Sequence, residues 1–417
     1  MNNILLIAAT CLLALLSTVG ASLPYPILPP LFAADAPNAL NNFLGLPPKL
    51  LFGIALTINP IGLLIGTALT GPLSDRFGRR PLLLVTALGA AVGHALTAAA
   101  LVAQSYPLFV LARFVTGLLE GNAAVARALI AERLEGPLRL RALSLVNGAL
   151  HLGWLVGPVM AGFTLGFGIA VPFLAAVGAL VLAAVLVAVT VPRQGTADDG
   201  PSWWQVARER HVVKLLRHTD LRTLFIIQLA ATCGVTAFYE YYPLWLVEQG
   251  GYDARGIATI NMALCAIMTL SAVIAGRPSK ADPLRRASVY ATLVGAAVAG
   301  VAFGNMWTGL IAIALFGIPN AFYNATLQAW CAERFAAHGQ GAVMGLLSMT
   351  FCFANILMAL AGSVLTLADT RLILLLGAAL SIWAGWRLRG WRGGLASALA
   401  AAKANEKANE NATGASI

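Results

Sequence analysis

The sequence contains few charged residues. Aspartate, glutamate, lysine and arginine make up 11% of its 417 residues, whereas a soluble domain typically has about 25%. Hydrophobic residues account for 59%. A chain so poor in charge cannot cover a water-facing surface, so the composition excludes an ordinary soluble protein and predicts an integral membrane protein.

The sequence also lacks the usual signatures of an enzyme or a metal protein. There is no nucleophile–base pair, no P-loop, and no G-x-G-x-x-G in the predicted cytoplasmic loops, so we predict no enzymatic activity and no cofactor. The net charge of +10 does not indicate nucleic-acid binding, because the basic residues lie between apolar segments rather than in one patch. The cysteines form no C-x-x-C pair and lie in apolar segments, so we expect free thiols and no metal site: Cys11, Cys233, Cys265, Cys331 and Cys352.

Long apolar runs fill most of the chain. A bilayer core about 30 Å thick requires roughly 20 residues of helix. Twelve segments meet this length: 4–30, 49–71, 82–103, 107–131, 141–166, 170–191, 223–247, 255–276, 286–304, 307–331, 341–366 and 371–389. We therefore predict an all-α membrane protein with six-helix halves at 1–191 and 223–389, a mixed-charge cytoplasmic linker at 192–222 and a disordered tail at 390–417.

Basic residues are distributed unevenly among the predicted loops. Most of the 27 lysine and arginine residues lie in the even-numbered connections and the tail, whereas Lys49, Arg255 and Arg371 lie on the opposite side. Loops rich in lysine and arginine stay in the cytoplasm. We therefore expect both termini to be cytoplasmic, in a multi-pass protein of the inner membrane with the lipid bilayer as its partner.

The most informative stretch is residues 71–80, which read Gly-Pro-Leu-Ser-Asp-Arg-Phe-Gly-Arg-Arg between two apolar segments. We predict a tight loop on one membrane face. The pattern G-x-L-x-D-R-x-G-R-R resembles the loop 2–3 signature of the major facilitator superfamily of secondary transporters. The resemblance implies the major facilitator fold and a loop that locks the cytoplasmic side in the outward-open state; simple topological anchoring is the alternative. The implied gating residues are Gly71, Asp75, Arg76, Gly78, Arg79 and Arg80, with Glu132 as an acidic partner.

The fifth apolar segment contains Gly153, Gly157, Pro158 and Gly162. Small residues at this spacing let helices pack closely, and the proline adds a bend. The segment resembles the G-x-x-x-G-P motif of drug:proton antiporters. With Leu-Pro-Tyr-Pro-Ile-Leu-Pro at 23–29 and Ala-Arg-Phe-Val-Thr-Gly at 112–117, it makes residues 15–190 similar to the tetracycline-efflux branch; the second half matches only in general pattern. Ordinary glycine packing is the alternative.

The fourth apolar segment carries Arg113, Glu120 and Arg127 at seven-residue spacing, which places them on one stripe of a continuous helix. Charges inside the membrane are costly and usually functional. In the resembling family, the Arg113 position holds an arginine linked to proton coupling. Glu120 and Arg127 are candidates for contacts with this transporter's own substrate. An ion-pair ladder that only holds helices together is the alternative.

The seventh apolar segment carries Glu240 between aromatic residues, among them Tyr239 and Tyr242. Such a group could bind an organic cation or a planar molecule, or the rings could form an interfacial belt with Glu240 near the headgroups. Because the first segment has no acid of the tetracycline-efflux type, proton carriage falls to Glu120 or Glu240. We interpret His94 and His151 as plain polar contacts.

These observations predict a proton-coupled secondary transporter. We expect a monomer, driven by the proton gradient, that exports a small amphipathic organic molecule by alternating access of its two halves. The alternative is proton-coupled import of a siderophore or a small anionic metabolite, because Arg113 and Arg127 could equally receive an anionic solute.

Overall fold

A computed structural model describes residues 3–33, 38–192, 216–275, 281–335 and 340–391. Within these ranges ten helices are long and apolar enough to cross a membrane. Two shorter apolar stretches of helix, Tyr106–Leu119 and Met349–Leu365, lie in the two remaining predicted segments. The all-α membrane fold is confirmed, and the helices are consistent with the predicted twelve crossings.

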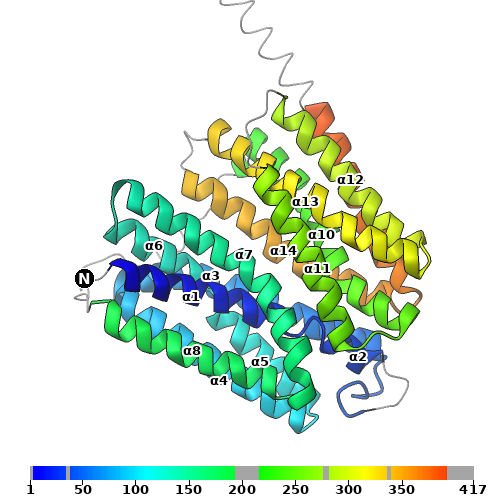
Figure 1. The fold of residues 1–417 in the computed structure, drawn as a ribbon, viewed down its shortest axis with the longest axis horizontal. Coiled ribbons are helices and arrows are strands. Elements are labelled where there is room, and N and C mark those ends of the chain that lie inside the picture. Colours follow the sequence, from blue (N-terminus) through cyan, green and yellow to red (C-terminus); the bar gives the residue numbers. More distant parts are fainter. Residues whose placement is uncertain (1–2, 34–37, 193–215, 276–280, 336–339, 392–417) are drawn as a thin grey trace, which may run out of the picture.

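The helices form two groups in chain order (Figure 1). The first group contains α1 (Asn3–Ser22), α2 (Leu28–Phe32), α3 (Pro48–Phe77), α4 (Arg79–Val102), α5 (Tyr106–Leu119), α6 (Ala123–Arg133), α7 (Gly136–Thr164), a 3-10 turn η1 (Leu165–Phe167) and α8 (Val171–Thr190). The second contains α10 (Thr219–Gly250), α11 (Ala254–Ala275), α12 (Pro283–Phe303), α13 (Met306–Arg334), α14 (Gln340–Leu365) and a last helix, Thr370–Trp391. We call these groups the first half and the second half.

The fourth apolar segment is not one helix. It is divided into α5 and α6 by a break at residues 120–122. Ser17 of α1 donates to the backbone oxygen of Glu120 over 2.8 Å, and Gly121 follows at the break. The expected continuous stripe of Arg113, Glu120 and Arg127 is therefore interrupted, because Arg127 lies on the second piece.

The stretch 71–80 is not a ten-residue loop. Helix α3 continues to Phe77, and α4 begins at Arg79. Only Gly78 interrupts the helices, with φ of 89°. A glycine adopts this conformation without steric cost, so a single residue makes the connection and both helices extend beyond their apolar segments.

The two halves share one hydrophobic core near α2. This core joins Phe52 of α3 to Tyr241 of α10, whose rings pack edge to face with centroids 6.0 Å apart. Helix α3 packs against α14, and α7 against α11. At the surface of the same end, Lys49 and Glu248 form an ion pair of 2.7 Å between the halves. The end of the molecule that carries α2 is therefore closed.

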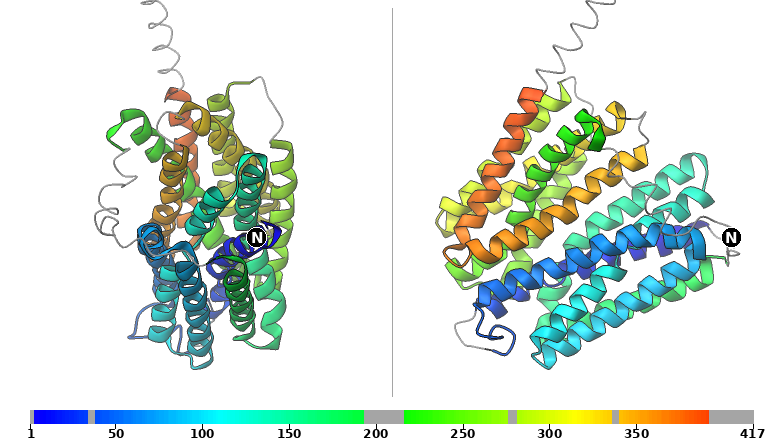
Figure 2. Two further views of the ribbon diagram at one scale, coloured as in Figure 1. Left: turned by 90° about the vertical axis from the view of Figure 1, so that its left-hand side faces the viewer. Right: turned by 180° about the vertical axis from the view of Figure 1, so that it is seen from behind.

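The halves separate toward the end that carries the N-terminus. The three other hydrophobic clusters of the described residues each stay within one half, two in the first and one in the second. Figure 2 shows the two groups of helices converging near α2 and spreading apart toward the N-terminus. The structure thus has one closed end and one end where the halves keep separate cores.

Candidate functional site

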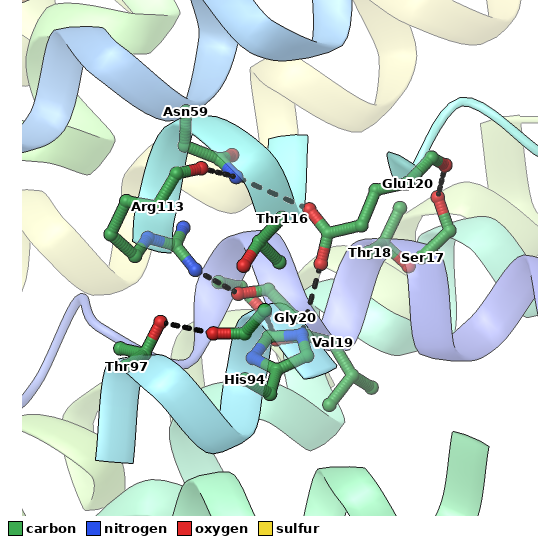
Figure 3. A network of polar contacts seen from close by, with 12 residues as sticks. Ser17, Thr18, Val19, Gly20, Asn59, His94, Thr97, Arg113, Thr116 and Glu120 are labelled. Atoms are coloured by element: carbon green, nitrogen blue, oxygen red, sulfur yellow. Dashed lines mark hydrogen bonds and ion pairs between the residues drawn. The ribbon is translucent and has the colours of Figure 1, made fainter. Parts of the chain in front are cut away.

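A buried acid and a buried histidine meet inside the first half. The Nε2 atom of His94 on α4 lies 3.1 Å from Oε1 of Glu120, at the end of α5. His94 is 0% and Glu120 2% exposed. The other carboxylate oxygen, Oε2, accepts a hydrogen bond of 3.3 Å from the Asn59 amide on α3. Three helices therefore contribute directly to one polar centre (Figure 3).

Glycines allow the helices to approach this centre closely. A Cβ atom on Gly20 of α1 would overlap both the Glu120 carboxylate and the His94 ring. A Cβ on Gly93 would meet Thr116, and one on Gly117 would meet the backbone of Asn59. The polar centre is thus enclosed by backbone, without room for additional side-chain atoms at these positions.

Arg113 lies beside the same centre and is 3% exposed. Its Nη1 donates to the backbone oxygen of Gly20 over 3.2 Å, and its own backbone oxygen accepts from Asn59 over 3.2 Å. Arg113 interacts electrostatically with Glu120, but the two form no direct ion pair among the described contacts. An ion-pair ladder therefore does not describe this helix, because the guanidinium binds a carbonyl of α1 instead.

A narrow cavity lies between the halves, and Arg113 is part of its lining. The first half contributes residues of α1, α2, α3, α5 and α7 and of the segment joining α1 to α2, and the second half contributes residues of α14. Among the described residues Arg113 is the only charged one in the lining, and Glu120 is not part of it. The other lining residues used below are Tyr25, Asn59, Trp154, Phe351 and Asn355.

Aromatic rings close this cavity between the two halves. Trp154 of α7 packs edge to face against Tyr25, at 5.8 Å, and against Phe351 of α14, at 5.5 Å. The lining therefore combines aromatic rings with the positive charge of Arg113, which suits contact with a flat apolar group that has a polar or negatively charged end.

Glu240 occupies a second buried position, in α10 of the second half. It is 2% exposed, and its Oε2 atom has no hydrogen-bond partner among the described residues. The Tyr25 hydroxyl interacts electrostatically with both Glu240 and Arg113. Glu240 is not in the cavity lining, so the structure does not place it in contact with a molecule held there.

The aromatic residues around Glu240 do not form an interfacial belt. Tyr242 and Trp245 are 2% and 0% exposed and belong to the core shared by the halves. Tyr242 donates to Asn261 over 3.1 Å, and the half-buried Tyr239 packs edge to face on Phe316 at 5.6 Å. These rings pack inside the protein, so the interpretation of an interfacial belt is wrong for them.

The basic residues after α3 make contacts within the first half. Arg79 and Glu132 form an ion pair of 2.6 Å, which ties the start of α4 to the end of α6. Arg80 donates to the backbone oxygen of Ala188 over 2.6 Å, and the Arg76 guanidinium lies over the Phe77 ring. The side chains of Asp75 and His151, and the surroundings of Gly71, lie outside the described part of the structure. Arg127 is half-buried on α6.

The glycines of α7 lie against α1 and α11. A Cβ on Gly153 would overlap Thr18, one on Gly157 would overlap Ser22, and one on Gly162 would overlap Ala258. Ser22 and Thr18 also donate to backbone oxygens of α7, over 3.1 Å to Gly153 and 2.8 Å to Leu150. Pro158 lies inside α7 without ending it.

Two members of the polar centre are not predicted by the sequence. His94, expected to make a plain polar contact, faces the one acid of the fourth segment. Asn59 was not singled out, although an asparagine followed by Pro60 in an apolar run is a visible signal. Both lie far from Glu120 in sequence, so only helix packing reveals that they meet it.

Known proteins resemble this chain in both sequence and fold. The sequence profile described as the Major Facilitator Superfamily matches residues 10–359. The class C tetracycline resistance protein of Escherichia coli is 32% identical over 165 residues, which are 39% of this chain and 38% of that protein. The class G tetracycline resistance protein of Vibrio anguillarum is 25% identical over 345 residues, 80% of this chain and 83% of that protein. The crystal structure of the human organic anion transporter MFSD10 (TETRAN) superposes with a TM-score of 0.68 and 17% identity, covering 93% of this chain and 100% of that one.

Proposed function

This chain belongs to the Major Facilitator Superfamily and is a membrane transporter, and we propose that it exports a small amphipathic organic molecule in exchange for protons. The observation that carries the proposal is the buried acid Glu120 beside a cavity between the two halves. The tetracycline resistance relatives support the export direction.

In this proposal the basic loops place the N-terminus in the cytoplasm, and the closed end with Lys49 and Glu248 faces the outside. The separate cores at the other end then belong to a cytoplasm-facing state. Rocking of the halves would open the α2 end and close the other, so that the cavity is exposed to each side in turn.

The proton gradient supplies the energy. A proton would reach Glu120 from the outside and leave it toward the cytoplasm during each cycle. A carboxyl group suits this task because it can bind and release one proton, and Glu120 is buried beside Arg113. No cofactor enters this cycle.

The first experiment identifies the transported molecule. The purified protein is screened by thermal shift against drugs and metabolites, since a ligand at about 100 times its Kd stabilises the fold by about 2.7 kcal/mol. A hit that loses its stabilising effect in Arg113→Ala binds at the proposed cavity. Deletion of the gene should then raise the host's intracellular level of that molecule and its sensitivity to it.

Proton-coupled import of a small anion is the second candidate, and one observation favours it. Arg113 is the only charged residue that the described part of the chain contributes to the cavity lining, and a guanidinium receives a carboxylate or other anion well. A deletion strain that takes up less of the screened molecule, with uptake restored by the intact gene, would replace export by import.

A further inference from the structure

We propose that His94 and Glu120 together form a proton-binding site, closed by Gly20 and separate from the cavity. The proposal rests on the proposed function, because proton coupling requires such a site. It differs from direct competition between substrate and proton for one carboxylate, since Glu120 does not line the cavity and His94 is its immediate partner.

The contact geometry allows the pair to hold one additional proton. The Nε2–Oε1 distance of 3.1 Å fits a hydrogen bond in which a neutral His94 donates to the Glu120 carboxylate. The Nδ1 atom of His94 is buried and has no partner in the described part of the chain. An imidazolium would bury an unpaired N–H there, so the added proton is placed on Glu120 as a carboxylic acid.

The surroundings contain few groups that could compete for this proton. Helix α1 presents Ser17 and Gly20, α3 presents Asn59, and α8 presents the Phe173 ring, 6.2 Å from the His94 ring. The only other ionisable group that the described contacts place beside the pair is Arg113 of α5. Arg113 is therefore the one charged neighbour of the pair among the described contacts.

Gly20 connects the proton site to the cavity. Its backbone lies against both members of the pair, and its carbonyl oxygen accepts from Arg113, which lines the cavity. A proton on Glu120 removes the negative charge near Arg113, and a molecule in the cavity acts on the same guanidinium from the other side. Proton and substrate thus occupy different places and influence each other through Arg113 and α1.

Infrared difference spectroscopy of the purified full-length protein in lipid nanodiscs tests the site without a substrate. Acidification should produce a carboxyl C=O band that is absent from Glu120→Gln and retained in Glu240→Gln. In His94→Gln the midpoint of this band should move by about one pH unit or more, because coupled groups share their titration. A merely structural histidine would leave the midpoint unchanged.

Two glycine variants test whether Gly20 closes the proton-binding site. Gly20→Ala should shift the same midpoint, whereas Gly148→Ala on α7, where the added Cβ meets open space, should not. If Gly20→Ala does not fold, the midpoint of the carboxyl band in His94→Gln still tests the proposal. An unchanged midpoint in His94→Gln, or a band that disappears in Glu240→Gln and persists in Glu120→Gln, would overturn the proposal. A titrating pair in a protein whose transport ignores the pH gradient would instead overturn the proposed function alone.

Discussion

At the residue scale, the buried charges differ in what surrounds them. Glu120 has His94 and Asn59 as partners, and Arg113 has the carbonyl of Gly20. Glu240, in contrast, has a carboxylate oxygen without a partner among the described residues. An unpaired buried carboxylate destabilises a fold unless it is protonated. The two acids are therefore expected to respond differently to neutralisation.

Glu240→Gln should leave the thermal stability of the purified protein unchanged or raise it, because the substitution removes a buried ionisable group at nearly constant volume. Thermal unfolding followed by tryptophan fluorescence measures this effect, with Glu120→Gln as the comparison. Stability that falls by several kcal/mol in Glu240→Gln would mean that the carboxylate makes a bond essential to the second half.

The sequence predicted the charged residues of the site but not their arrangement. The cost of intramembrane charge identifies Arg113 and Glu120 directly. Their partners could not be predicted, because Gly20, Asn59 and His94 reach Glu120 only through packing of α1, α3 and α4. The position of Glu240 outside the cavity lining likewise depends on how the halves meet, which no local pattern encodes.

At the element scale, the lengths of the apolar segments and the spacing of their glycines predicted most of the helices and their close packing. The break after α5 falls on Gly121 and Asn122, a short local signal inside an apolar run that was otherwise expected to be one helix, and Ser17 contacts the backbone there. Similarly, α3 continues through a charged stretch to Phe77, because a helix does not have to end where its apolar face ends.

The packing of α1 on α7 gives an element-scale prediction. Gly157→Leu should lower stability by about 1–3 kcal/mol, the usual cost of overpacking, and block transport, because the added side chain overlaps Ser22. Gly148→Leu on the same helix faces open space and is the matched control. Thermal unfolding and transport of the screened ligand measure both effects. Equal stability of the two variants would show that α1 and α7 do not pack as described.

At the scale of the whole molecule, the two halves meet asymmetrically. Their shared core and the Lys49–Glu248 pair lie at the α2 end, whereas the opposite end has separate cores. A transporter that alternates must break these contacts in its other state. The contacts at the α2 end therefore stabilise the conformation seen here relative to the other.

Reversal of one charge in the Lys49–Glu248 pair should shift the equilibrium between the two conformations. Lys49→Glu should open the α2 end more often, by up to about fivefold, since a partly exposed pair contributes up to about 1 kcal/mol. The double variant Lys49→Glu with Glu248→Lys should restore the wild-type distribution. Distances between spin labels on the two halves at the α2 end report the populations. Identical distributions in the wild type and Lys49→Glu would show that the pair does not influence the conformational balance.

The central claim is that a proton on Glu120 drives transport through the cavity beside Arg113. The most direct test is accumulation of the screened ligand in inside-out membrane vesicles with an imposed pH gradient, acidic inside. Wild-type vesicles should concentrate the ligand until the gradient is dissipated, and Glu120→Gln vesicles should only exchange it without accumulation. Accumulation in wild-type vesicles without a pH gradient, or undiminished accumulation in Glu120→Gln, would contradict the claim.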